Sequence, residues 1–393
     1  MNILLIAGRP PDPRGKGDAK IASHVSETLR SEGHTVVHAV PPPIVAISKT
    51  LNALGALAGG QPLQIGVTRS RGLAREVKRI LGMNDIDLTV AVHARTAHYV
   101  PRELRSRSIA FLYDSCALAY ATYAGRLPYW MDPVFRLEQR RMVTYERSIV
   151  EQFGRVAVLA SPDLQYLRSL TPRPTSVVRV PYAVDIAYFS QTVRRPVVDP
   201  PLFTFVGRLG YIPNQDAVRQ LVTRVWPAIR ARRPSARLRV VGARPGRRLR
   251  ALLADHRVEL AADVDDVRTQ LQETTALLVP MRMGTGVQTK VLEAMAAGVP
   301  VICTSFANAG LNATPDEHLL IADTPDAYVA QAERLLADAA FTERLVAGAR
   351  SWVFAQHAPA VFTASFMGMC SDLARQPRPI SRPLIHSEKL RAG

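Results

Sequence analysis

The amino-acid sequence predicts an α/β protein built from two Rossmann-like domains that face a central cleft. Its 393 residues exceed what one ordinary hydrophobic core accommodates. Short runs rich in β-branched residues alternate with helical patterns, which indicates parallel strands joined by crossover helices. The alternation stops at residues 190–201, where SQTVRRPVVDPP holds three prolines, and then starts again. Two α/β halves of similar size are therefore expected.

The periodicity places the elements of both halves. In the first half, strands are predicted at 2–8, 35–40, 88–93, 109–114 and 155–160, and helices at 18–32, 46–58, 69–81 and 132–153. In the second half, strands are predicted at 202–207, 237–242, 258–261, 276–280 and 299–303, and helices at 213–230, 246–254, 265–273, 287–297, 324–337 and 341–356. The predicted organisation is a domain at 1–185, a linker at 186–201, a domain at 202–356 and, at 357–393, a helix followed by a disordered tail. Ligands of such sheets bind at the carboxyl ends of the strands.

Composition narrows the class of protein. Hydrophobic residues make up 47% and charged residues 21% of the chain, as in globular proteins. The cysteines, Cys116, Cys303 and Cys370, lie far apart without metal-ligand spacing, which favours a reducing compartment over a disulfide scaffold. The N-terminal apolar run is short and resembles a buried strand rather than a signal peptide. A cytoplasmic protein is expected.

The net charge of +17 comes almost entirely from arginine, with 44 arginines and only six lysines. These arginines are scattered over predicted helices, and no module that reads DNA or RNA is recognisable, so nucleic acid is not an expected partner. A solvated basic surface and a dedicated polyanion site both remain open.

The stretch Met281–Ser305 carries the chief functional signal. Gly284 and Gly286 follow the predicted strand that ends at Pro280, and they allow a tight turn and a close approach to a ligand. The helix that follows is predicted to begin near Gly286, and its free N–H groups favour an anion such as a phosphate. Gly298 is predicted to end that helix.

Two charged residues lie on this helix. Lys290 is one turn in, and Glu293 is on a neighbouring part of the same face, where its carboxylate can accept two hydrogen bonds from a vicinal diol such as a ribose. A nucleoside diphosphate fits this layout, although a plain turn with a surface Lys–Glu pair has the same spacing. Lys290 is the sole lysine between Lys78 and Lys389 in a chain rich in arginine, which suggests that this position requires the geometry of a lysine rather than that of an arginine.

Several motifs together resemble the GT-B glycosyltransferases of family 4, the "glycosyl transferases group 1" set. GTGVQTKVLEAMAAGVPVICTS resembles their donor-nucleotide motif, FVGRLGYIPNQDAV (205–218) the first strand and loop of their donor domain, and VVRVPYAVD (177–185) the entry into it. The N-terminal GRPPDPRGKGDAKIASHVSETLRSEGHTV is similar to their acceptor-domain opening. QPLQIGVTRSRGL and YDSCALAY resemble one subgroup, the sugar transferases of bacterial exopolysaccharide clusters.

The resemblance implies roles for residues of the second half. Glu293 matches the second glutamate of the family's E-x7-E motif, which holds the donor ribose, and Arg208 matches the arginine on the diphosphate. The chain departs from the family twice, because Thr285 replaces the first glutamate and Asn214 the lysine that often follows the arginine. Lys290 is expected to supply the missing cation and to stabilise the leaving phosphate.

In the first half, the loop 13–20 is expected to approach the sugar or its phosphates. Asp18 has the alternative role of capping the next helix, and the glycines that of plain turn residues. His93 ends a predicted strand and is expected to contact the transferred sugar, with His98 as a rival and a structural role as the alternative. Asp114 ends another strand and is assigned to the acceptor side, or to capping. The full donor-binding set is Gly15, Lys16, Gly17, Arg208, Gly284, Thr285, Gly286, Val287, Lys290 and Glu293, with His93, Arg208 and Lys290 as catalytic and Asp18 and Asp114 as acceptor-binding residues.

The resemblance implies a retaining, metal-independent hexosyltransferase without a cofactor, in which the nucleotide-sugar is a substrate. The acceptor is expected to be a glycan, a lipid-linked or a small molecule. The apolar segment 41–66 belongs to the core or, alternatively, lies on the anionic inner face of the cell membrane. A nucleotide-sugar epimerase of the same architecture and a non-enzymatic polyanion-binding protein are the alternative functions.

Overall fold

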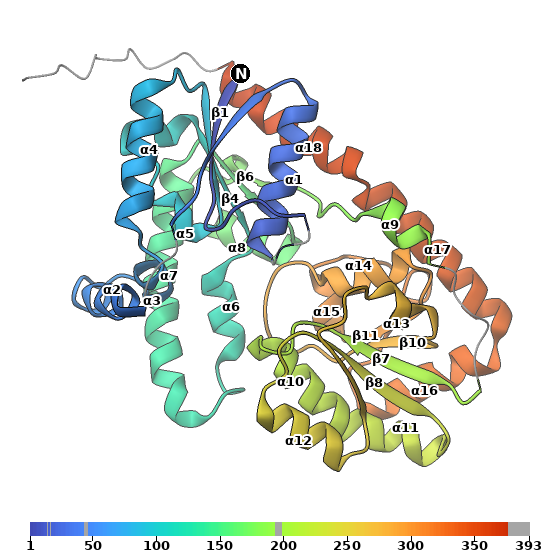
Figure 1. Cartoon of the computed structure of the whole chain (residues 1–393). Helices are drawn as coiled ribbons and strands as arrows, with labels where there is room; N and C mark the ends of the chain where they lie inside the picture. Colours follow the sequence, from blue (N-terminus) through green and yellow to red (C-terminus); the bar gives the residue numbers. More distant parts are fainter. Residues whose placement is uncertain (14, 16, 43–45, 193–198, 376–393) are drawn as a thin grey trace, which may run out of the picture.

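The computed structural model describes residues 1–13, 15, 17–42, 46–192 and 199–375. Within them the chain forms two parallel six-stranded sheets flanked by helices, so the predicted α/β class is confirmed (Figure 1). The first sheet has the order β2-β1-β3-β4-β5-β6. Its strands are β1 (Asn2–Ile6), β2 (Thr35–Ala39), β3 (Leu88–Val92), β4 (Ser108–Tyr113), β5 (Arg155–Val158) and β6 (Val177–Arg179). The second sheet has the order β12-β11-β10-β7-β8-β9. Its strands are β7 (Leu202–Val206), β8 (Arg237–Gly242), β9 (Glu259–Ala262), β10 (Ala276–Val279), β11 (Val301–Cys303) and β12 (Leu320–Ile321).

The helices cover the faces of the sheets. Those before the second sheet are α1 (Asp18–Ser31), α2 (Ala46–Ala58), α3 (Leu63–Val67), α4 (Arg71–Met83), α5 (Ala94–Ala97), α6 (Cys116–Tyr123), α7 (Asp132–Gln152), α8 (Ser161–Ser169) and α9 (Ile186–Ser190). Those after β7 are α10 (Ile212–Gln220), α11 (Trp226–Arg232), α12 (Arg247–Asp255), α13 (Arg268–Gln272), α14 (Thr289–Ala296), α15 (Ser305–Ala309), α16 (Pro325–Ala337), α17 (Ala339–His357) and α18 (Pro359–Ala374). A π-helical segment, Leu221–Val225, joins α10 to α11, so the helix predicted at 213–230 is continuous. None of the described helices is long and apolar enough to cross a membrane.

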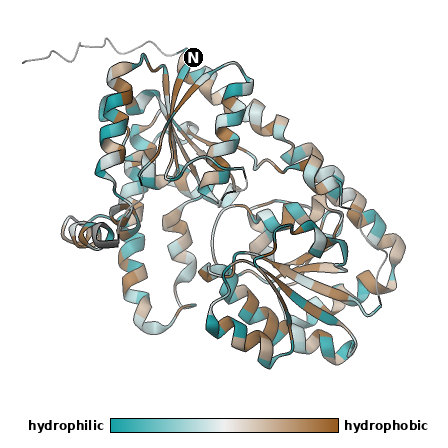
Figure 2. Cartoon of the chain, viewed as in Figure 1, coloured by the Kyte–Doolittle hydropathy of each residue, from teal (hydrophilic) through white to brown (hydrophobic). Residues whose placement is uncertain are grey.

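The core lies along the central strands, which are buried on both faces as in other parallel sheets. Ile3, Leu4, Leu5 and Ile6 of β1 are fully buried, as is all of β10. Figure 2 shows hydrophobic residues on the strands of both sheets. The strands β6 and β12 were not predicted, because runs of three and two residues are too short to show a period.

The chain crosses between the two units twice. The first crossing follows β6, and the second is the passage from α17 to α18, which returns to the first sheet (Figure 1). The rings of Phe362 and Phe366 pack 6.1 and 5.9 Å from that of Phe111 in β4. The crossings are joined, because Val184 N–H donates to the His357 carbonyl at 2.8 Å. Parts of the predicted linker and tail, residues 193–198 and 376–393, lie outside the described residues.

Candidate functional site

The two units meet at the carboxyl ends of their strands. The glycine loop (residues 280–288), which follows β10, contacts segments that follow β4 and β5 of the first sheet. Gly284 N–H donates to Thr122 Oγ1 at 2.8 Å, and Gly286 N–H donates to Asp163 Oδ2 at 3.0 Å. The Thr285 hydroxyl donates to the Ser115 carbonyl at 3.3 Å. The two units therefore contact each other at the edge of the sheets where the sequence predicts ligands to bind.

The glycine loop turns as the sequence predicts, but its helix begins later. Gly284 and Gly286 have φ angles of 108° and 74°, a region that disfavours other residues. A Cβ at Gly286 would lie 3.3 Å from the Asp114 Cβ. Helix α14 begins at Thr289 rather than near Gly286, because the backbone stays non-helical as far as the N-cap residue Gln288.

This later start changes which N–H groups an anion can reach. Those of Gly284 and Gly286 are bonded across the cleft. Among the described residues, the N–H groups of Val287 and Gln288 have no hydrogen-bond acceptor. The free N–H groups at this helix start are therefore those of Val287 and Gln288, and the predicted anion site stays a prediction.

Lys290 is held at the start of α14 by polar partners. Its Nζ donates to Asn214 Oδ1 at 2.8 Å and to Gln288 Oε1 at 3.2 Å. Burial lowers the pKa of Lys290 to about 8, although the neighbouring Glu293 carboxylate opposes the shift. The amide of Asn214 also donates to the Arg208 carbonyl at 3.0 Å. Asn214, where the resemblance expects a lysine, thus links the side chain of Lys290 to the backbone of Arg208.

Arg208 lies in the loop after β7, and its side chain is exposed. In the described part of the chain its guanidinium has no hydrogen-bond or salt-bridge partner. An unpaired guanidinium at a strand end can bind a phosphate in a bidentate manner.

Glu293 faces the other unit. Its Oε1 lies 3.6 Å from Nζ of Lys20, the third residue of α1, across the cleft. Burial raises the pKa of Glu293, and the charges of Lys20 and Lys290 partly counteract it. Burial disfavours the charged form of Lys20, but Tyr182 and Glu293 outweigh this effect and raise its pKa. Sequence reasoning gave Lys20 no role, because nothing local indicates a partner 273 positions further along the chain.

His93 and Asp114 lie together on the first unit, at the ends of β3 and β4. A nitrogen of His93, a carboxylate oxygen of Asp114 and the sulfur of Cys116 lie within 4.8 Å of one another. His93 Nδ1 accepts a hydrogen bond from Arg95 N–H at 3.1 Å, and burial lowers the pKa of His93 well below its usual value. His98 instead packs against Tyr99, with ring centroids 4.0 Å apart. His93 is therefore the histidine beside Asp114.

Burial, followed by the charges of Asp163 and Glu146, raises the pKa of Asp114 to about 8, so its carboxyl group is mostly protonated at neutral pH. Nitrogen, oxygen and sulfur ligands of this kind suit Zn²⁺, and their proximity was not visible in the cysteine spacing. The guanidinium of Arg95 lies close enough to lower the pKa values of all three groups, and its charge opposes a bound cation.

The loop predicted to approach the sugar follows β1. Gly17 is the N-cap of α1, with φ 36°, and Asp18 is the first helical residue, so the expectation that Asp18 caps the helix is wrong. The Asp18 carboxylate lies 3.7 Å from Arg9 and contributes to raising the pKa of Tyr113, next to Asp114. Gly15 is tightly packed, because a Cβ there would lie 2.9 Å from Ala19 Cβ. Lys16 lies outside the described residues.

Two buried carboxylates beside the cleft were missed from the sequence. Glu146 accepts hydrogen bonds from Ser115 Oγ and Cys116 N–H, both at 2.7 Å, and Asp163 accepts one from Ser115 N–H at 2.7 Å. Burial raises the pKa of Glu146 to about 7 and that of Asp163 to about 6, against the effect of these bonds. One signal was present: Glu146 lies four residues after Met142 on the buried stripe of α7.

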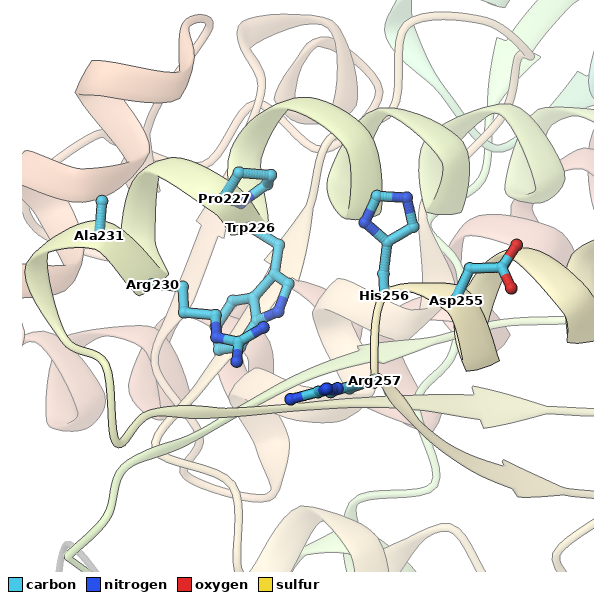
Figure 3. A pocket seen from close by; sticks show the side chains of 7 residues that line it. All are labelled: Trp226, Pro227, Arg230, Ala231, Asp255, His256 and Arg257. Atoms are coloured by element: carbon cyan, nitrogen blue, oxygen red, sulfur yellow. The ribbon is translucent and has the colours of Figure 1, made fainter.

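A surface hollow elsewhere has no predicted site residue in its lining. Figure 3 shows it between α11 and the end of α12. Its lining consists of Trp226, Pro227, Arg230, Ala231, Asp255, His256 and Arg257.

Residues 200–338 match the family model described as glycosyl transferases group 1. No curated protein matches the sequence. The sucrose-phosphate synthase of Thermosynechococcus elongatus is similar in structure, with a TM-score of 0.71 and 18% identity over 95% of this chain and 98% of that one. Anabaena HepE in complex with UDP and glucose has a TM-score of 0.61 and 11% identity, covering 94% and 99%. A trehalose-6-phosphate structure from Escherichia coli with bound UDP-2-fluoro glucose has a TM-score of 0.65 and 13% identity, covering 96% and 100%.

These comparisons confirm the predicted resemblance to GT-B glycosyltransferases of group 1, while the resemblance to family 4 and to the exopolysaccharide subgroup stays a prediction. The chain has the GT-B fold of these glycosyltransferases, and the match to the group 1 family model covers the second sheet and helices α10 to α16. The match spans the glycine loop, Arg208, Lys290 and Glu293.

Proposed function

We propose that the protein is a retaining, metal-independent glycosyltransferase that moves a sugar from a nucleotide-sugar donor to an acceptor hydroxyl. The carrying observation is the arrangement at α14, where the glycine loop, Lys290 and Glu293 face Lys20, His93 and Asp114 of the other unit. This arrangement brings together a carboxylate that can bind a diol, the cations Lys290 and Lys20, and the free N–H groups of the glycine loop.

The donor occupies the second unit. Glu293 accepts hydrogen bonds from the ribose, while Arg208 and Lys290 bind the diphosphate near the N–H groups of Val287 and Gln288. Arg208 and Lys290 supply the positive charge that a divalent metal ion supplies in other transferases. Two of the similar structures hold UDP compounds, which makes UDP the first carrier to test.

The acceptor occupies the first unit, on the side of Asp18 and Asp114. Its hydroxyl oxygen attacks the anomeric carbon on the face from which the diphosphate leaves, so that configuration is retained. The bond to the diphosphate breaks, and the diphosphate takes the hydroxyl proton, so no carboxylate nucleophile is required. Neutral His93 contacts the transferred sugar, and closure of the cleft excludes bulk water, leaving the acceptor position to one hydroxyl group or one water molecule.

Thermal unfolding with nucleotides tests this function. A nucleotide or nucleotide-sugar at ~100 times its dissociation constant is expected to stabilise the protein by ~2.7 kcal/mol. UDP, GDP, TDP and ADP are compared with their sugar conjugates, and heparin serves as a polyanion control. Stabilisation by heparin and by none of the nucleotides would instead indicate the polyanion-binding function.

We further propose that the first unit rests on an anionic membrane. Exposed apolar side chains lie on two segments of the first unit, α2 and the start of α7, which together are called the apolar ridge; in Figure 1, α2 lies beside the middle of α7 rather than at its start. The members of the ridge are Leu51, Leu54, Leu57, Tyr129, Trp130, Val134 and Leu137. Trp130 is 66% and Tyr129 89% exposed, and both residue types favour the bilayer interface. The exposed Arg126 and Arg140 flank them and suit anionic headgroups, whereas Arg136 forms a salt bridge with Asp132 at 3.0 Å.

Vesicle binding is expected to depend on this ridge. Trp130→Ala should weaken binding to vesicles with anionic lipid about fivefold, since partial burial of this ring contributes about 1 kcal/mol. Met83→Ala, which removes another exposed apolar side chain, should leave binding unchanged. Co-sedimentation measures both, and 0.5 M salt should weaken the interaction. Equal losses in the two variants would contradict a specific ridge.

A further inference from the structure

The strongest unassigned feature is a buried carboxylate that joins the two units at the glycine loop. Asp163, in the first turn of α8, is fully buried. Its Oδ1 accepts from Ser115 N–H at 2.7 Å within the first unit, and its Oδ2 accepts from Gly286 N–H at 3.0 Å in the second. One carboxylate thus hydrogen-bonds both walls of the cleft.

The first-unit side of this link is rigidly held. Ser115 uses its N–H for Asp163, its hydroxyl hydrogen for Glu146, and its hydroxyl oxygen to accept from Leu118 N–H at 3.1 Å. Its carbonyl accepts the bond from the Thr285 hydroxyl. Ser115 and Asp163 therefore present two fixed acceptors to consecutive residues of the glycine loop.

The loop side is equally restricted. Gly286 has a φ of 74°, and a Cβ at Gly310 would lie 2.4 Å from the Gly286 carbonyl oxygen. The carbonyl of Gly286 therefore packs tightly against Gly310, while its N–H is bonded to Asp163. The peptide cannot rotate without breaking the bond to Asp163.

We propose that Asp163 is a positioning residue that latches the glycine loop to the first unit when the cleft closes. The hydrogen bond to Asp163 occupies Gly286 N–H and leaves the N–H groups of Val287 and Gln288 for the diphosphate. This role toward the diphosphate rests on the proposed function. Closure of the cleft and the donor-binding backbone conformation are thereby coupled through one side chain. A purely structural Asp163 would only hold the turn before α6 through Ser115.

Asp163→Asn separates these roles. The amide oxygen can keep the shorter bond to Ser115 within the first unit, and the amide nitrogen then faces Gly286 N–H, which also donates. The interdomain bond is lost while the local one remains. Asn312→Ala is the matched control, because it removes another bond between the units, from Asn312 Nδ2 to Ser161 Oγ at 2.6 Å, and keeps the bond from Gly286 N–H to Asp163.

Hydrogen exchange of the peptide containing residues 284–288 is measured at pH 7.5, without ligand. Exchange should be at least tenfold faster in Asp163→Asn than in the wild type or Asn312→Ala. Exchange that is unchanged in Asp163→Asn, or equally accelerated in Asn312→Ala, would overturn the latch. Because no ligand is present, this result stands whether or not the protein binds a nucleotide.

The kinetic measurement uses release of UDP from UDP-glucose, with water as acceptor. In Asp163→Asn, kcat should fall at least tenfold while the UDP dissociation constant changes less than threefold, since Arg208, Lys290 and Glu293 are intact. A kcat within twofold of the wild type would overturn the positioning role. Failure of UDP and other nucleotides to bind the wild type would refute the proposed function and the donor-positioning role, and the exchange result alone would then decide the latch.

Discussion

Replacement of Glu293 by alanine is expected to weaken nucleotide binding at least ~100-fold. The carboxylate would accept two hydrogen bonds from the ribose diol, and bonds to charged groups contribute about 1.5–3 kcal/mol each. The substitution also removes the partner of Lys20 across the cleft, which lies 3.6 Å away. Isothermal titration with the stabilising nucleotide measures the loss.

The controls separate the ribose contact from general effects of charge. Glu343→Ala removes an exposed carboxylate of α17 and should leave the dissociation constant unchanged. Glu293→Gln keeps the size of the side chain and one acceptor, so its loss should lie between the two. Binding by Glu293→Ala within threefold of the wild type would show that α14 does not hold the ribose.

The sequence predicted best those elements whose signal lies in a short run of neighbouring residues. All ten predicted strands are present, because each combines a β-rich run with a neighbouring turn signal. Helix α6 was missed, since CALAYATY has no polar face that reveals a helical period. The start of α14 was placed too early, because glycines mark a turn without stating how far it continues.

The contacts across the cleft were not predictable from local patterns. Lys20 approaches Glu293, and Asp163 approaches Gly286, only because two separately folded sheets face each other. Single positions of the sequence carry no information on such pairs. Glutamates at helical spacing with apolar residues, as Glu138 and Glu146 are with Met142 on the buried stripe of α7, are the type of signal that does remain visible.

The two departures from the family pattern have structural counterparts. Asn214, in place of a lysine, accepts a hydrogen bond from Lys290 at 2.8 Å. The residue at this position therefore supplies no cation of its own and instead holds the ammonium group of Lys290. Thr285, in place of a glutamate, turns its hydroxyl to the Ser115 carbonyl across the cleft. The second departure thus contributes to the contact between the units, and a carboxylate at this position would meet a carbonyl oxygen instead.

Lys290→Met is expected to lower donor affinity and UDP release together, by about 100-fold in kcat/KM, because the cation would act on both the bound and the departing diphosphate. Methionine retains a long unbranched side chain but removes the ammonium group, which lies 3.8 Å from Met281 Sδ and 5.3 Å from the centre of the Phe205 ring. Lys78→Met, at an exposed position of α4, is the control. A kcat/KM for Lys290→Met within threefold of the wild type would place the diphosphate elsewhere.

The pH dependence of the wild type provides an independent check on Lys290. Its pKa of about 8 lies below the usual 10.5, so the folded protein holds fewer protons at this site than the unfolded chain between these values. The contribution of Lys290 to folding stability therefore rises with pH in this window. Donor affinity should change in the opposite direction, falling by up to about tenfold per pH unit above pH 8 as the cation is lost. Stability and affinity are thus expected to change in opposite directions with pH. A fall in nucleotide affinity above pH 8 that is absent in Lys290→Met therefore cannot arise from unfolding linked to this lysine. An affinity that does not change between pH 7 and 9.5 would show that the charge of Lys290 has no part in donor binding.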